Sequence, residues 1–164
     1  MNEIVLPKFM HFGAGSINQI TDILKKINCS RPIIITDNTM VDLKIIEPLE
    51  KSLTSFQLRY EIYKNTIPEP TAESIQEGVS IINKGEYDCI IAFGGGSPID
   101  SAKAMSILAK YGGHISDYKF PHINMKNGLP LIAIPTTAGT GSEATKFTII
   151  TNEKTDEKML CVGP

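Results

Sequence analysis

Three consecutive glycines followed by a serine form the segment with the clearest chemical potential. Residues 94–100 read Gly-Gly-Gly-Ser-Pro-Ile-Asp and follow an apolar run at residues 89–93. Because glycine has no Cβ, a diphosphate can approach the backbone closely at such a turn. A helix that begins just after the glycines adds unpaired N–H groups and a dipole that favour an anion there. The segment therefore indicates a phosphate-binding turn built from the main chain of Gly94, Gly95 and Gly96.

The residues after the glycines predict how that helix begins. Ser97 is a natural N-cap, Pro98 suits the first helical position, and Asp100 would then fall in the first turn. The segment matches neither a Walker A motif nor the GxGxxG fingerprint. A glycine-rich turn without a ligand is the alternative interpretation. Phosphate binding is favoured, because ligands of open α/β sheets bind at the carboxyl ends of the strands.

A second polar loop follows another expected strand. Residues 135–145 read Pro-Thr-Thr-Ala-Gly-Thr-Gly-Ser-Glu-Ala-Thr and come directly after the apolar run at residues 131–134. Small hydroxyl side chains can donate to ligand oxygens, and the glycines permit close contact. The composition is equally compatible with a flexible polar loop. Because both loops follow strands of one expected sheet, we predict that they meet across one crevice.

Asp37 ends the expected strand at residues 32–36. An acidic residue at this position can accept hydrogen bonds from a ribose diol, and its charge repels a 2′-phosphate. The alternative is an Asp turn cap leading into Asn38 and Thr39, and the residues alone favour that second interpretation.

No other group of residues has the spacing of a known catalytic or metal site. The histidines show no metal-ligand spacing, and no Ser/His/Asp or Cys/His arrangement stands out. The cysteines are odd in number and far apart in the sequence, so they predict neither a disulfide framework nor a CxxC site. Glu143 and Lys103 could take part in acid–base chemistry, but nothing in the sequence marks them. The histidines are His11, His114 and His122, and the cysteines are Cys29, Cys89 and Cys161.

Apolar runs alternate with amphipathic stretches along the chain. We expect a helix starting at Ser16 with a capping box, and a helix from Thr71 to Gly85. This alternation predicts an α/β fold, an open, mostly parallel, doubly wound (Rossmann-like) sheet with an appended β-hairpin. The other expected helices are 41–52, where Pro48 is unfavourable, and 97–110; the expected strands are 32–36, 56–63, 89–93 and 131–134, with the hairpin at 147–151 and 159–162.

Composition excludes several classes of protein. The 164 residues fit one domain, residues 1–164, and a net charge of −2 argues against nucleic-acid binding. No apolar run is long enough to span a membrane, and residues 1–4 do not begin a signal peptide. With an odd number of cysteines, a reducing cytoplasm is the expected location.

The two loops together resemble the metal-dependent (iron-containing) alcohol dehydrogenase family. The resemblance is carried by residues 94–104 and 134–145. It extends over essentially the whole chain, including Gly13-Ala14-Gly15, Thr36-Asp37, Pro68-Glu69-Pro70-Thr71 and Lys158. It implies that the chain is similar to the family's first domain, which binds NAD(P).

The resemblance also implies roles for individual residues. The glycine turn and Ser97 would hold the pyrophosphate, and Asp37 would face the adenosine ribose and favour NAD over NADP. Asp100 would lie near the nicotinamide, and Lys158 would reach the nicotinamide ribose. Residues of the second loop and the hairpin would line the adenine and nicotinamide halves of the groove: Thr136, Thr137, Thr140, Thr145 and Phe147.

One departure from the family changes the expected activity. The family continues with an all-helical domain of roughly 200 residues, whose Asp and His residues hold Fe2+ or Zn2+. The chain lacks that domain, so we expect the cofactor-binding part of a longer enzyme, inactive alone. The full enzyme would transfer a hydride between nicotinamide and a primary alcohol or diol, or its aldehyde. The alternative is a stand-alone dinucleotide-binding module without chemistry. An exposed apolar face would favour a homodimer.

Overall fold

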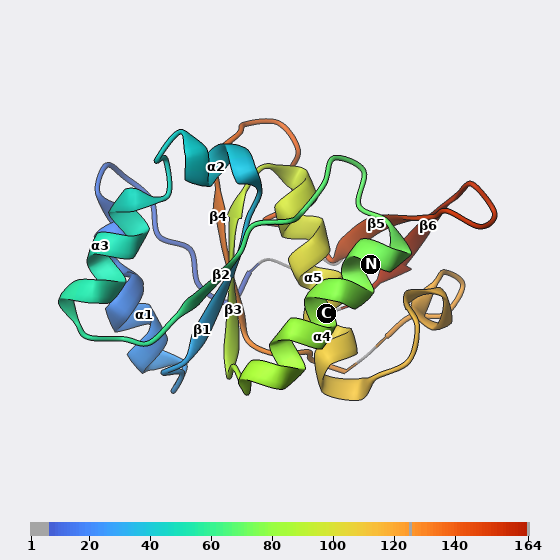
Figure 1. The fold of residues 1–164 in the computed structure, drawn as a ribbon, viewed down its shortest axis with the longest axis horizontal. Helices are drawn as coiled ribbons and strands as arrows, with labels where there is room; N and C mark the ends of the chain where they lie inside the picture. The colour runs from blue at the N-terminus through green and yellow to red at the C-terminus, as the bar shows by residue number, and fades with distance from the viewer. Residues whose placement is uncertain (1–6, 125, 164) are drawn as a thin grey trace, which may run out of the picture.

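Four parallel strands form the centre of the molecule (Figure 1). The computed structural model describes residues 7–124 and 126–163, so the segment tested for a signal peptide, residues 1–4, lies outside it. In the order β2-β1-β3-β4, the sheet confirms the predicted parallel α/β architecture. The strands are β1 (Pro32–Ile35), β2 (Glu61–Tyr63), β3 (Cys89–Gly94) and β4 (Leu131–Pro135).

Helices cover both faces of this sheet, as the sequence predicts. Side chains alternate along the strands, so Ile33 and Ile35 belong to one core cluster while Ile34 belongs to the other. In Figure 1, α1 and α3 pack on one face, and α4 and α5 pack on the opposite face. The helices are α1 (Ile20–Lys26), α2 (Asn38–Asp42), α3 (Glu47–Ser55), α4 (Ala72–Gly85) and α5 (Gly96–Tyr111), with short 3-10 turns η1 (Ser16–Gln19) and η2 (Ile115–Tyr118).

The predicted hairpin is present and lies beyond α5, on the side away from the sheet (Figure 1). Its strands, β5 (Phe147–Asn152) and β6 (Glu157–Val162), pair antiparallel. Ile150, Met159 and Cys161 are buried in the same cluster as α4 and α5. The hairpin is therefore a third layer that holds α5 from outside.

Three sequence predictions were wrong at element ends. Ser16 forms no capping box, because Gly15, with φ 79°, precedes a 3-10 turn that has no side-chain cap. The helix expected at 41–52 is two helices, and Pro48 lies in the first turn of α3, where its missing N–H is tolerated. The strand expected at 56–63 is paired only over β2, because Gln57, with φ 56°, reverses the chain first.

The helix predicted from Thr71 to Gly85 is confirmed. The Thr71 hydroxyl accepts a hydrogen bond from the Ser74 N–H, and the Ser74 hydroxyl accepts one from the Thr71 N–H. Glu86, in the left-handed region with φ 53°, ends the helix just after Gly85. Among the helices in residues 7–124 and 126–163, none has the length and apolar character of a membrane span.

Among the described residues, β4 forms one edge of the sheet. Within the described part of the chain, β4 pairs with β3 alone. Four of its aliphatic residues are only half-buried, whereas every residue of β3 is buried. Unpaired backbone groups and aliphatic side chains at a sheet edge promote association.

We predict that the 164-residue chain self-associates. Phe12 lines the groove beside β4 and is 83% exposed, so Phe12→Ser should weaken association without loss of stability. Phe56 is also exposed but is not among the groove's residues, and Phe56→Ser is the matched control. Sedimentation velocity over a concentration series measures the effect. A wild-type chain that stays a monomer at high concentration contradicts this prediction.

Candidate functional site

The glycine turn connects β3 to α5. Gly94 has φ +144°, and a Cβ there would lie 2.8 Å from Cγ of Pro98. A Cβ on Gly95 would lie 3.2 Å from Thr137 Oγ1, and one on Gly96 would lie 3.3 Å from Thr140 Cγ2. The turn therefore has no room for side chains at Gly94, and little at the next two positions.

The start of α5 differs from the prediction. Gly95 is the N-cap, in extended conformation, and no side chain caps the helix. Ser97 is consequently the second helical residue, Pro98 the third, and Asp100 lies beyond the first turn. Gly95 can occupy the N-cap position without a side chain, which moves the helix start earlier. The first N–H groups of a helix have no intrahelical partner, so an uncapped terminus leaves them available to an anion.

The two predicted loops meet at the carboxyl edge of the sheet, as expected. The Thr136 N–H donates to the Gly94 carbonyl over 2.9 Å. Thr137 lies beside Gly95, and Thr140 lies beside Gly96. In Figure 1 the connection from β4 to β5, α2 and the start of α5 gather at this edge. Parallel pairing of β3 with β4 brings the loops together.

Asp37 has the capping role that the residues alone favour, while its role toward a ribose stays a prediction. One carboxylate oxygen, Oδ1, accepts a hydrogen bond from the Met40 N–H at 3.1 Å and so caps α2. The other, Oδ2, lies 3.5 Å from the position of a Cβ on Gly94. The cap orients the carboxylate and leaves one oxygen beside the glycine turn.

Asp100 and Lys103 attach α5 to the second loop and the hairpin. The Asp100 carbonyl accepts a hydrogen bond from the Thr148 hydroxyl at 2.9 Å. Its carboxylate lies 3.8 Å from the Lys103 ammonium, and both side chains are mostly buried. Lys103 also donates to Thr145 Oγ1 at 3.2 Å and to the Phe147 carbonyl at 2.8 Å. Burial raises the pKa of Asp100, partly offset by Lys103, and burial lowers the pKa of Lys103.

A cavity of about 230 Å³ brings together four of the predicted site residues: Gly96, Ser97, Asp100 and Lys158. The Lys158 ammonium donates to Glu69 Oε1 at 2.9 Å. Glu69 also lines this cavity and was missed, although its place between Pro68 and Pro70 marks a tight turn. The volume is below the ~300–1,000 Å³ of complete ligand pockets, so the cavity suits one part of an extended ligand.

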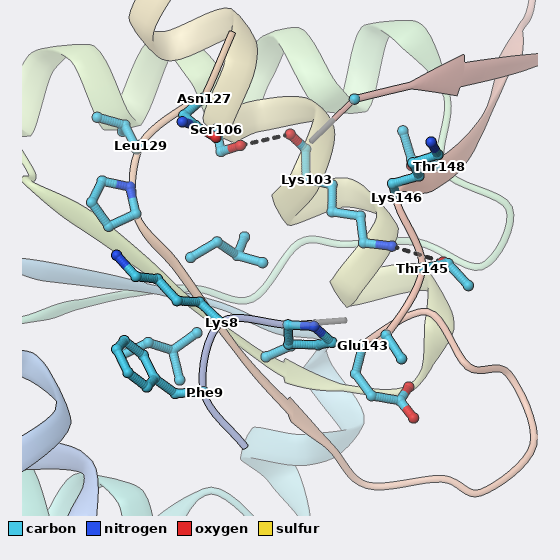
Figure 2. Close-up of a pocket in the computed structure, with 18 of the residues that line it drawn as sticks. Lys8, Phe9, Lys103, Ser106, Asn127, Leu129, Glu143, Thr145, Lys146 and Thr148 are labelled. Atoms are coloured by element: carbon cyan, nitrogen blue, oxygen red, sulfur yellow. Dashed lines mark hydrogen bonds between the residues drawn. The ribbon is translucent and has the colours of Figure 1, made fainter. Parts of the chain in front are cut away.

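Thr145 and Phe147 lie in a larger groove of about 1580 Å³ beside β4 and α5. Figure 2 shows Lys103 directed at Thr145, with Glu143 and the N-terminal residues Lys8 and Phe9 along the same groove. Neither Thr145 nor Phe147 lines the smaller cavity. Asp100 lines the small cavity and Lys103 lines the groove, so their ion pair joins the two hollows. Six of the predicted residues line neither hollow: Asp37, Gly94, Gly95, Thr136, Thr137 and Thr140.

The described residues offer no metal site at this edge. The one group of three metal-ligating side chains found among residues 7–124 and 126–163 is Cys29, Asp88 and Cys89. It lies at the opposite end of β3, since Cys89 begins the strand that Gly94 ends. The fold therefore brings Cys29 and Cys89 together although they are far apart in the sequence.

The buried carboxyl of Asp100 predicts a pH dependence of stability. Its pKa is raised in the folded state, so the folded state binds more protons than the unfolded state just above pH 4. That part of the stability is present at low pH and lost as the pH rises through the folded pKa. Relative to wild type, Asp100→Asn should thus become progressively more stable between pH 4 and pH 7 in urea unfolding. A constant difference over this range contradicts the prediction.

The chain resembles known proteins over nearly its whole length. It is 35% identical over 157 residues to alcohol dehydrogenase 4 of Saccharomyces cerevisiae, covering 96% of this chain and 41% of the yeast protein. It is 32% identical over 171 residues to lactaldehyde reductase of Escherichia coli, covering 99% of this chain and 43% of the reductase. The chain thus spans about two-fifths of the length of these relatives.

Solved structures show the same fold. Alcohol dehydrogenase from Oenococcus oeni aligns with this chain at a TM-score of 0.91 and 33% sequence identity. Sulfoacetaldehyde reductase from Bifidobacterium kashiwanohense, in complex with NAD+, aligns at a TM-score of 0.90 and 30% sequence identity. Each alignment covers 99% of this chain and 43% of the other. The family model for iron-containing alcohol dehydrogenase matches residues 7–164. The chain therefore belongs to the iron-containing alcohol dehydrogenase family, as its two loops suggested.

Proposed function

We propose that this chain is the dinucleotide-binding part of an NAD-dependent oxidoreductase, which transfers a hydride between nicotinamide and a primary alcohol or diol, or its aldehyde. The uncapped N-terminus of α5 beneath the glycine turn is the observation that carries the proposal. It offers backbone N–H groups and a helix dipole to a diphosphate. Relatives named as alcohol dehydrogenases and a lactaldehyde reductase support the reaction class.

Each part of the site suits one part of the cofactor. The backbone of Gly94, Gly95, Gly96 and Ser97 binds the pyrophosphate in this proposal, and the carboxylate of Asp37 accepts hydrogen bonds from the adenosine ribose. Lys158 and Asp100 border the small cavity. In this proposal they contact the nicotinamide end of the cofactor. In this proposal the second loop and the start of β5 contact the rest of the cofactor through Thr136, Thr137, Thr140, Thr145 and Phe147.

The chemical step needs more than these residues. A divalent cation, Fe2+ or Zn2+, would supply Lewis-acid stabilisation of the substrate oxygen. Because the described residues provide no ligand set at this edge, we propose that the ligands come from polypeptide outside the 164 residues. The chain alone then binds cofactor without turnover.

The same observation favours a second candidate, a stand-alone dinucleotide-binding module. Both proposals expect NAD binding by the chain. They differ on the reading frame after Pro164. An uninterrupted frame that encodes a helical domain with an Asp-x-x-x-His pair supports the enzyme, and a stop codon there supports the module.

Cofactor selectivity tests the role of Asp37. Its carboxylate repels a 2′-phosphate, so calorimetric titration of the metal-free chain should show NADH binding about tenfold or more tighter than NADPH. Asp37→Ser keeps an N-cap for α2 but removes the charge, and should reduce that difference to a few-fold. Asp42→Ser, at an exposed acidic residue of the same helix, is the control that keeps the difference. Failure of the folded chain to bind either nucleotide refutes the proposed function.

The glycine turn is tested by a single added methyl group. In Gly95→Ala the new Cβ lies 3.2 Å from Thr137 Oγ1, at the place where the two loops meet. A small adjustment of Thr137 keeps the fold, but the methyl group occupies the approach of the diphosphate, so the Kd for NADH should rise about tenfold or more. Gly163→Ala, whose Cβ has its nearest neighbour at 4.0 Å, is the control. Unchanged NADH affinity in Gly95→Ala would contradict a backbone-built phosphate site.

A further inference from the structure

The amino ends of β1 and β3 carry a cluster of two thiols and a carboxylate. Cys89 is the first residue of β3, and Asp88 precedes it. Cys29 lies three residues before β1. Because β1 and β3 pair in parallel, with Pro32 opposite Cys89, the approach to β1 passes beside the start of β3. Residues 60 positions apart in the sequence thereby become neighbours.

The three side chains lie within reach of one ion. One ligand atom from each, Sγ of Cys29, Sγ of Cys89 and a carboxylate oxygen of Asp88, lie within 4.8 Å of one another. Ligand atoms around a tetrahedral zinc ion lie roughly 3.5–3.8 Å apart, given bonds of ~2.0–2.3 Å. Side-chain rotations that move the ligand atoms by about an ångström therefore bring all three to bonding distance of one ion.

Backbone hydrogen bonds already hold the carboxylate in place. Asp88 Oδ2 accepts from the Ser30 N–H at 2.7 Å, and Oδ1 accepts from the Arg31 N–H at 2.9 Å. The Ser30 hydroxyl adds a contact of 3.1 Å to Oδ2. The Arg31 guanidinium instead reaches the Gly85 carbonyl at 2.9 Å and Glu86 at 3.5 Å. Carboxylates that bind metals are commonly oriented by such hydrogen bonds, which leave lone pairs for the ion.

The cluster is buried at its thiols and open to solvent at its carboxylate. Burial raises the pKa of both thiols, so an ion has to displace their protons. Cys89 is fully buried and Cys29 is 8% exposed, whereas Asp88 is half-buried and Ser30 and Arg31 are exposed. An ion can therefore enter from the Asp88 side and keep a solvent molecule as its fourth ligand.

We propose that Cys29, Cys89 and Asp88 bind a thiophilic divalent cation of the Zn2+ class. Each thiol releases its proton to solvent, and each thiolate sulfur donates an electron pair to the ion. The two thiolate charges balance the ion, and Asp88 adds a third anionic ligand. A bound ion ties the start of β1 to the start of β3, and so stabilises the sheet at the end opposite the glycine turn.

Titration of the full, reduced 164-residue chain with Co2+ tests the proposal. Co2+ takes zinc-like geometry and reports thiolate ligands by a charge-transfer absorption band in the near ultraviolet. We expect one ion per chain, appearance of that band, its displacement by Zn2+, and a rise in melting temperature with Zn2+. A wild-type chain that binds no Co2+, or binds it without a thiolate band, refutes the site whatever the variants do.

Variants assign the ligands. Cys29→Ser and Cys89→Ser should each lower Co2+ affinity by about a hundredfold, and Asp88→Asn by about tenfold with the thiolate band retained. Cys161 is the matched control, since it is also buried but contacts the Ile115 carbonyl in the other core cluster. Cys161→Ser should bind Co2+ like wild type, and circular dichroism without metal checks that each variant is folded. Loss of binding in Cys161→Ser, or its retention in both other serine variants, overturns the assignment.

Discussion

The pairing of β3 with β1 on one side and β4 on the other determines where the two loops, Asp37 and the cysteine cluster lie. Because the three strands run parallel, their carboxyl ends place Asp37, Gly94 and Thr136 at one edge. The same pairing places Cys29 beside Cys89 at the opposite edge. Burial of β1 and β3, whose apolar side chains alternate between two cores, stabilises this pairing.

The glycine turn has no side chain of its own, and side chains from other segments surround it. The Asp37 carboxylate lies beside Gly94, Thr137 lies over Gly95, and Thr140 lies over Gly96. The helix below it has no cap, which leaves polar groups unsatisfied at a cost in stability. A buried carboxyl at Asp100, with Oδ1 lacking a hydrogen-bond partner in the described chain, adds to that cost. Both features lie at the edge where the dinucleotide is proposed to bind, and a ligand there would offset these costs.

Sequence reasoning succeeded where the signal was a long buried run and failed where neighbours in space decided the outcome. The strands β1 and β3, the α4 cap at Thr71 and the hairpin follow from local patterns. The uncapped start of α5 does not, because Ser97 is a better N-cap in isolation than Gly95. The partners Glu69–Lys158 and Cys29–Cys89 are 89 and 60 positions apart, so no spacing rule reveals them.

The β4 edge of the sheet is linked to the proposed nucleotide site through β4 itself. Thr136 follows the last residue of β4, and its N–H bonds Gly94, so the position of the second loop depends on how firmly β4 is held. In the described chain β4 is held by β3 on one side and borders a groove of about 1580 Å³ on the other. Its half-buried aliphatic residues gain stability from whatever covers that groove. Because fixing β4 also fixes Thr136 against the glycine turn, covering the groove and ordering the dinucleotide site are energetically coupled. A polypeptide that packs beside β4 would therefore act on the proposed dinucleotide site without contacting the cofactor.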